Sequence, residues 1–376
     1  MRSLAWLIAA IVLALGSQVA AMASDDTPCA AARTDDAIAQ CRAAVAKGNA
    51  TPRDLAKALW VRGRDAARAD TLDAALADLD AAIAADPTLA VAFNSRGVVY
   101  RRQRQYDKAL ADLDSAIRLE PKSAIFFANR GRTFHEMHDL EKAMADYDHA
   151  LMLDPKHVSA LYSRGMVHYE RRELDAAIAA FNEALALDPG NAVGLANRAE
   201  AYHDRGDIDR AIQDYNEALR CDPRYVAGFT NRGRMLQDKG DYAAAIADYS
   251  AALALDPGNI FALHNRAAAY VRTHDVDHAI ADAGRALARD PNDATALLNR
   301  GSAYASRGDY TSAIADYSQA LRIDADDIDA LFGRGQAYEE LGDFAGARAD
   351  YSRLSQSKPN EREIRERLEN VRARMK

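Results

Sequence analysis

The chain has 376 residues and a formal net charge of −8, with acidic and basic residues interspersed along its length. This balance argues against nucleic acid as a general partner, because a phosphate backbone is bound by a surface of net positive charge. An ordinary globular chain of this length would form two or three domains.

Residues 1–23 have the parts of a secretory signal peptide. Arg2 supplies the positive end, residues 4–15 are apolar, and Ala21-Met22-Ala23 is a small-residue cleavage site. The apolar run is too short to span a bilayer comfortably, so we expect cleavage and no stable membrane insertion. An uncleaved anchor is the alternative. The bacterial pattern of this signal, together with the Ala-, Asp- and Arg-rich composition, predicts a periplasmic protein.

Residues 24–55 are expected to form an N-terminal cap built as a degenerate half-repeat, with a linker at residues 48–52. In an oxidising compartment Cys29 and Cys41 are close enough in sequence to pair. A bridge over so short a loop stabilises by roughly 2–3 kcal/mol in the chain-entropy description. Cys221 is left over, and we interpret it as a small buried apolar residue.

Residues 56–359 repeat with a period of 34 residues, which indicates a repeat array whose core runs from repeat to repeat. Apolar residues at spacings of three, four and seven predict two short helices in each repeat. One alanine column and one arginine column never vary. The arginines are Arg62, Arg96, Arg130, Arg164, Arg198, Arg232, Arg266, Arg300 and Arg334.

This period and these columns resemble the tetratricopeptide repeat. The resemblance implies an all-α, right-handed superhelical solenoid of nine tandem helix-turn-helix repeats. Their first residues are Ala56, Ala90, Ala124, Val158, Ala192, Val226, Ile260, Ala294 and Ile328. The seventh repeat carries Val276 and Ala283 where its neighbour carries tyrosines, so we expect it to be the most loosely packed. Residues 360–376 have apolar positions on one side and are expected to form a C-terminal capping helix.

An aspartate column accompanies the arginines and is broken only at Ala180. A residue type present in every repeat usually does what every repeat needs. We therefore predict that the guanidinium bridges helices, either through this aspartate or through the acidic residue before each proline. Arginine suits this role because its planar fork satisfies two acceptors while its stem packs.

The candidate binding groove combines two sets of residues. In the family, the residue before the arginine lines the concave face. Here that residue is often asparagine, and in superhelical members such amides hold the backbone of an extended peptide. The alternative is that the amides only satisfy local helix groups. The second set varies from repeat to repeat, and its arginines in the N-terminal half favour the acidic part of a bound segment. The candidates are Asn129, Asn197, Asn231, Asn265, Asn299, Arg101, Arg132, Tyr162, Tyr169 and Arg234.

The sequence contains no Gly-rich phosphate loop, nucleophile elbow or metal-ligand cluster, so we predict no enzyme and no cofactor. The predicted function is a non-catalytic interaction scaffold of the bacterial envelope that binds a partner protein or peptide in its concave groove. The alternative is a structural assembly factor of an envelope complex that uses its convex face or its ends. The sequence leaves self-association open.

Overall fold

The computed structural model describes residues 28–358 and 361–376, and these residues form twenty helices and no strand. The predicted signal peptide and Pro359 lie outside the described residues. The all-α prediction is confirmed. In the part of the chain that the structure describes, no helix has the length and apolar character needed to cross a membrane.

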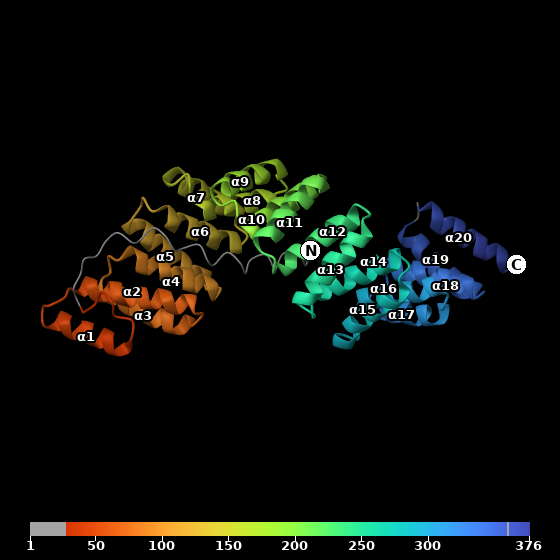
Figure 1. Cartoon of the computed structure of the whole chain (residues 1–376), viewed down its shortest axis with the longest axis horizontal. Coiled ribbons are helices and arrows are strands. Elements are labelled where there is room, and N and C mark those ends of the chain that lie inside the picture. Colours follow the sequence, from red (N-terminus) through yellow and green to blue (C-terminus); the bar gives the residue numbers. More distant parts are fainter. Residues whose placement is uncertain (1–27, 359–360) are drawn as a thin grey trace. The chain divides into compact units, whose positions relative to one another are not determined.

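The helices follow the predicted two-helix repeat. The first helices of the nine repeats are α2 (Pro52–Arg68), α4 (Ala90–Arg102), α6 (Ala124–Glu136), α8 (Val158–Glu170), α10 (Ala192–Asp204), α12 (Val226–Asp238), α14 (Ile260–Arg272), α16 (Ala294–Arg307) and α18 (Ile328–Glu340). The second helices are α3 (Leu72–Ala85), α5 (Tyr106–Leu119), α7 (Leu140–Leu153), α9 (Leu174–Leu187), α11 (Ile208–Cys221), α13 (Tyr242–Leu255), α15 (Val276–Arg289), α17 (Tyr310–Ile323) and α19 (Phe344–Ser357). Helices α1 (Asp35–Ala46) and α20 (Arg362–Arg374) flank them (Figure 1). Eight of the nine first helices begin at the predicted residue.

The chain divides into two compact units, Met1–Arg205 and Gly206–Lys376, which we call the N-terminal and C-terminal units. Each unit is a stack of helical hairpins in which consecutive helices pack against each other. The division falls between the two helices of the fifth repeat.

The core of each hairpin depends on small residues that let the two helices approach. The invariant alanines of the second helices are fully buried, as Ala245 and Ala313 show. Opposite them, a Cβ added at Gly233 would lie 2.7 Å from the Tyr249 ring. A side chain there would force the ring to move, so the glycine and the ring fill the space together.

The seventh repeat lacks this glycine–ring pair and has Ala267 and Ala283 instead. Ala283 is still 1% exposed. Burial alone does not measure packing, so loose packing of this repeat stays a prediction.

The N-terminal cap contains the predicted disulfide between Cys29 and Cys41, whose Cα atoms are 4.8 Å apart. Both cysteines are buried in a cluster with Leu59 of α2. Helix α2 begins at Pro52, earlier than the expected first residue of the repeat, because Thr51 and Asp54 form a capping box at its start. The expected linker therefore ends one residue sooner.

At the other end, α20 buries Ile364, Leu368 and Val371 and leaves its charged side exposed. This arrangement shields the last repeat from water, as a repeat array requires.

The prediction for Cys221 was wrong, because this side chain is only half-buried. It is the last residue of α11, and the leucines at the same place in other repeats, such as Leu187 at 42% exposed, also lie at the edge of the stack.

Candidate functional site

The first helices form one wall of each unit. In the N-terminal unit α2 contacts α4, α4 contacts α6, α6 contacts α8 and α8 contacts α10. In the C-terminal unit α12, α14, α16 and α18 contact one another in the same way. Because successive first helices lie close enough to touch, we call the surface that they present the inner wall of each unit.

The invariant arginines tie the repeats together. In seven repeats Nε and Nη2 donate to both oxygens of the aspartate sixteen residues ahead, at 2.5–2.8 Å. These seven arginines are Arg62, Arg96, Arg130, Arg232, Arg266, Arg300 and Arg334. The predicted bridge to the aspartate column is confirmed. The hydrogen bonds that Arg266 donates to Asp282 raise the pKa of Arg266, as expected for a guanidinium held by a carboxylate.

A third contact, absent from the sequence prediction, runs backward to the preceding second helix. Nη1 of Arg96 donates to Asp80 at 2.6 Å, and Nη1 of Arg266 donates to Ser250 at 2.8 Å. Both acceptors lie sixteen residues before the arginine. The guanidinium therefore joins its own hairpin to the previous one, which explains why the column never varies.

Arg164 is the exception, because Ala180 replaces its aspartate. Its Nη2 donates instead to Glu183 at 2.9 Å, and its buried Nε has no hydrogen-bond partner among the described residues. The fourth repeat is thus joined less completely than its neighbours.

The candidate asparagines lie on the first helices, and two of them bond to the neighbouring repeat. Nδ2 of Asn129 donates to Oδ1 of Asn94 at 2.8 Å, and Nδ2 of Asn299 donates to the carbonyl oxygen of His264 at 3.0 Å. Asn197 is 5% exposed, whereas Asn231 and Asn265 are half-buried.

The variable candidates of the N-terminal unit include two members of a contact series that the sequence analysis did not find. Its three contacts are Arg101 Nη1 to Glu136 Oε1, His135 Nε2 to Glu170 Oε1 at 2.8 Å, and Tyr169 OH to Asp204 Oδ2 at 2.9 Å. In each, a residue near the end of one first helix contacts an acidic residue thirty-five positions later. We call this series the polar ladder.

The remaining candidates differ in how much surface they present. Tyr162 is 5% exposed, and within residues 28–358 and 361–376 its OH has no hydrogen-bond partner. A Cβ added at Gly194 would lie 2.3 Å from that oxygen. Burial raises the pKa of Tyr162. Arg132 and Arg234 are half-buried on α6 and α12. The candidates are thus divided between the inner walls of the two units.

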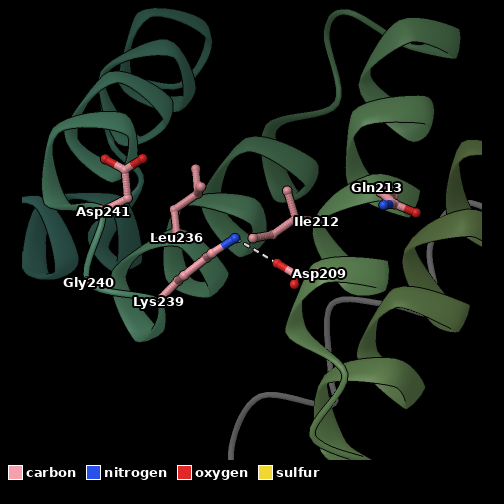
Figure 2. Close-up of a pocket in the computed structure, with 7 residues that line it drawn as sticks. All are labelled: Asp209, Ile212, Gln213, Leu236, Lys239, Gly240 and Asp241. Carbon is pink, nitrogen blue, oxygen red and sulfur yellow. Dashed lines mark hydrogen bonds and ion pairs between the residues drawn. The ribbon is translucent and has the colours of Figure 1, made fainter.

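A surface pocket of about 670 Å³ lies in the C-terminal unit between α11 and the α12–α13 hairpin (Figure 2). None of the candidate residues lines it. Across it, Lys239 Nζ donates to Asp209 Oδ1 at 2.6 Å, and the same spacing of thirty residues joins Arg171 to Glu141. The ion pair across the pocket is therefore a contact that recurs between repeats. Among the described residues, no group of three His, Cys, Asp or Glu is placed to hold a metal ion.

Solved structures similar to this one share its fold. A tetratricopeptide repeat protein from Parabacteroides merdae ATCC 43184 is 20% identical, covering 66% of this chain and 98% of its own, with a TM-score of 0.53. PilW, described as a widely conserved type IV pilus biogenesis factor, is 22% identical over 57% of this chain and 97% of its own, with a TM-score of 0.51. The Cut9-Hcn1 structure of APC/C is 15% identical over 90% of this chain and 84% of its own, with a TM-score of 0.52. The comparison with curated proteins returned no match.

Family models match most of the array. Models described as TPR repeat or tetratricopeptide repeat match residues 90–123, 129–192, 180–213, 199–240, 233–273, 301–342 and 329–360. Together these matches span more than half of the chain. With the hairpin stack and its 34-residue columns, they show that the chain belongs to the tetratricopeptide repeat family.

Proposed function

We propose that the chain is a non-catalytic protein-interaction scaffold of the bacterial envelope, and that it holds an extended segment of a partner protein against its inner wall. The signal pattern at residues 1–23 and the buried Cys29–Cys41 disulfide support export to an oxidising compartment.

The observation that carries the proposal is the hydrogen bonding of the asparagine side chains on the inner walls. Asn129 and Asn299 are each fixed by one hydrogen bond from Nδ2 to the neighbouring repeat. In the described part of the chain, neither Oδ1 accepts a hydrogen bond. Each amide therefore presents an acceptor that is already oriented, and a peptide N–H can use it with little loss of side-chain freedom.

The test is affinity capture from an envelope extract with the wild-type chain and with Asn129→Ala/Asn299→Ala. The matched control is Asn182→Ala/Asn216→Ala, which removes two amides that accept from Arg198 and Arg232. Circular dichroism establishes that each variant is folded. A partner lost by the wall variant and kept by the control supports the proposal.

An assembly factor that uses another face is the second candidate function. The observation that favours it is the row of leucines at the ends of the second helices, where Leu119, Leu153 and Leu187 are 36–42% exposed. A partner retained by the wall variant and lost by Leu153→Ser/Leu187→Ser would assign the function to this edge and overturn groove binding.

A further inference from the structure

The first contact of the polar ladder differs from the others because two guanidinium groups share one carboxylate oxygen. Arg101 of α4 donates through Nη1 to Oε1 of Glu136, and Nε of Arg132 lies 3.4 Å from the same atom. Arg132 and Glu136 are both on α6, so the cluster sits where two first helices of the inner wall meet. It holds two positive charges and one negative charge.

The cluster is also short of hydrogen-bond partners. The Arg101 side chain is 7% exposed, yet its buried Nε has no acceptor in the part of the chain that the structure describes. Tyr147, on α7 behind the wall, is buried against the same groups. A buried donor without an acceptor is unfavourable, and such groups are rare in folded proteins.

Electrostatics confirm that the charges are unbalanced. Burial lowers the pKa of Arg101, and the positive charge of Arg132 lowers it further, while Glu136 acts in the opposite direction. The charged groups that act on Tyr147 are the same three, Arg132, Arg101 and Glu136. Among the described residues, Glu136 is the only carboxylate that forms an ion pair with Arg101 or Arg132.

Neighbouring positions show that this imbalance is local. Arg64 occupies the same place in the first repeat as Arg132 does in the third, and both its Nε and Nη2 donate to Asp65, at 3.1 and 2.9 Å. The next contact of the ladder pairs His135 with Glu170, one donor to one carboxylate. Arg132 makes no other hydrogen bond or ion pair among the described residues, and its side chain is 26% exposed.

We propose that this cluster binds a carboxylate of an acidic segment of the partner, with the Arg132 fork as the contact to the ligand. The inference rests on the proposed function, and it specifies a carboxylate as the ligand group at the inner wall of the N-terminal unit. A carboxylate on Arg132 makes two parallel hydrogen bonds, leaves Glu136 to Arg101 alone, and brings the cluster to two positive and two negative charges. Arg101 and Glu136 then act as positioning residues.

The arrangement also predicts an unusual effect on stability. In the free chain the two guanidinium groups repel each other, and replacing Arg132 by glutamine removes that repulsion while keeping the size and polarity of the side chain. Binding and stability should therefore change in opposite directions. A residue with a purely structural role would lose stability on the same substitution.

The test measures both quantities on the full-length chain. The probe is a fluorescein-labelled peptide of alternating serine and glutamate, and the control probe is the serine–glutamine peptide of the same length. We expect the acidic peptide to bind, to weaken as salt is added, and to lose about tenfold or more in affinity in Arg132→Gln. The Tm of Arg132→Gln should rise by about 1–3 °C.

Two variants serve as controls. Arg64→Gln removes a guanidinium that already has its own carboxylate, so it should leave the affinity nearly unchanged and should not raise Tm. Arg132→Lys keeps the charge without the fork, and should keep the repulsion while binding the acidic peptide more weakly than the wild-type chain.

The proposal is overturned if Arg132→Gln lowers Tm and leaves the affinity for the acidic peptide unchanged, or if the acidic and neutral peptides bind alike. Failure of this proposal can be distinguished from failure of the proposed function. A partner that is still captured through Asn129 and Asn299 while the acidic peptide fails to bind would remove the carboxylate assignment and leave groove binding intact.

Discussion

The two units differ in the residue type at the turn inside each hairpin, where the backbone adopts a positive φ. In every repeat one turn residue has a positive φ. In the N-terminal unit these residues are Asp70, Arg104, His138 and Arg172, with φ of 59–63°. In the C-terminal unit they are Gly206, Gly240, Gly308 and Gly342, with φ of 77–90°, and His274 at 60°. Glycine adopts this conformation without strain, whereas other L-residues are disfavoured there.

What the N-terminal unit gains from the strained turns is contact between repeats. Arg102 donates to Asp70 at 2.6 Å, and Arg172 pairs with Asp204 of the next repeat. A glycine offers no side chain for such a bond. Two of the four non-glycine turn residues of the N-terminal unit thus join neighbouring hairpins through their side chains.

The arginine joints differ between the units in a parallel way. In the N-terminal unit Arg198 has a neutral third acceptor, Asn182, but the third acceptor of Arg96 and of Arg130 is a carboxylate, Asp80 and Asp114 respectively. In the C-terminal unit it is neutral, as with Ser250 for Arg266. Arg96 and Arg130 therefore each contact two carboxylates, whereas Arg266 contacts one. Removing the aspartate sixteen residues ahead should therefore cost more stability at Arg266 than at Arg96 or Arg130.

The largest effect should come from removing that aspartate. We expect Asp282→Ala to lower the free energy of unfolding by about 2–3 kcal/mol, because it leaves Arg266 with a single neutral acceptor. Asp112→Ala should be milder, at about 1–2 kcal/mol, because Asp80 still holds Arg96. Urea unfolding of the full chain followed by circular dichroism measures both. Equal losses would contradict the proposed difference between the units.

In the fourth repeat, where the contact of Arg164 is incomplete, a substitution should raise the free energy of unfolding. Ala180→Asp should restore the two-oxygen contact to Arg164 and raise the free energy of unfolding by about 1 kcal/mol, since the buried Nε gains an acceptor. Ala180→Leu, which fills space without an acceptor, is the control. Thermal unfolding that ranks the two variants in the reverse order would show that packing dominates at this position.

Gly284 allows the backward contact of Arg300 to be introduced by single substitutions. It occupies the acceptor position for Arg300, and a Cβ there would meet no atom within 4 Å. Gly284→Ala should add about 0.5–1 kcal/mol through helix propensity. Gly284→Ser should exceed it if the hydroxyl accepts from Arg300, and Gly284→Asp would recreate the pattern of the N-terminal unit. Chemical denaturation of the three variants separates propensity from hydrogen bonding, and three equal values would argue against a third bond.

Exchanging the turn residues should give the smallest changes, of opposite sign in the two units. We expect Arg104→Gly to stabilise by about 0.5–1 kcal/mol and Gly240→Ala to destabilise by a similar amount. His274→Gly should behave like Arg104→Gly although it lies in the C-terminal unit. The Tm of each variant provides the measurement. If His274→Gly is neutral, the strain depends on more than φ.

The sequence predicted most of the fold because the same pattern of apolar, small and charged residues recurs in each repeat. The arginine and aspartate columns share the repeat's period, so their pairing within a hairpin could be deduced. The contact between Arg101 and Glu136 could not be, because it depends on how one hairpin lies on the next and involves residues that vary. The turn column was hidden because five of its nine members in the described structure are not the glycine that usually marks a left-handed residue.

The backward bond of the arginine also bears on how the array can change in length. Arg62 of the first repeat donates to Asp35 of the cap at 2.7 Å, so the cap offers the bond that a preceding second helix would offer. The cap therefore offers the first repeat the same kind of contact that Asp80 and Asp114 offer Arg96 and Arg130. A repeat copied or deleted as a whole period would leave matching joints behind it, so recombination can lengthen or shorten this protein without a new interface having to evolve.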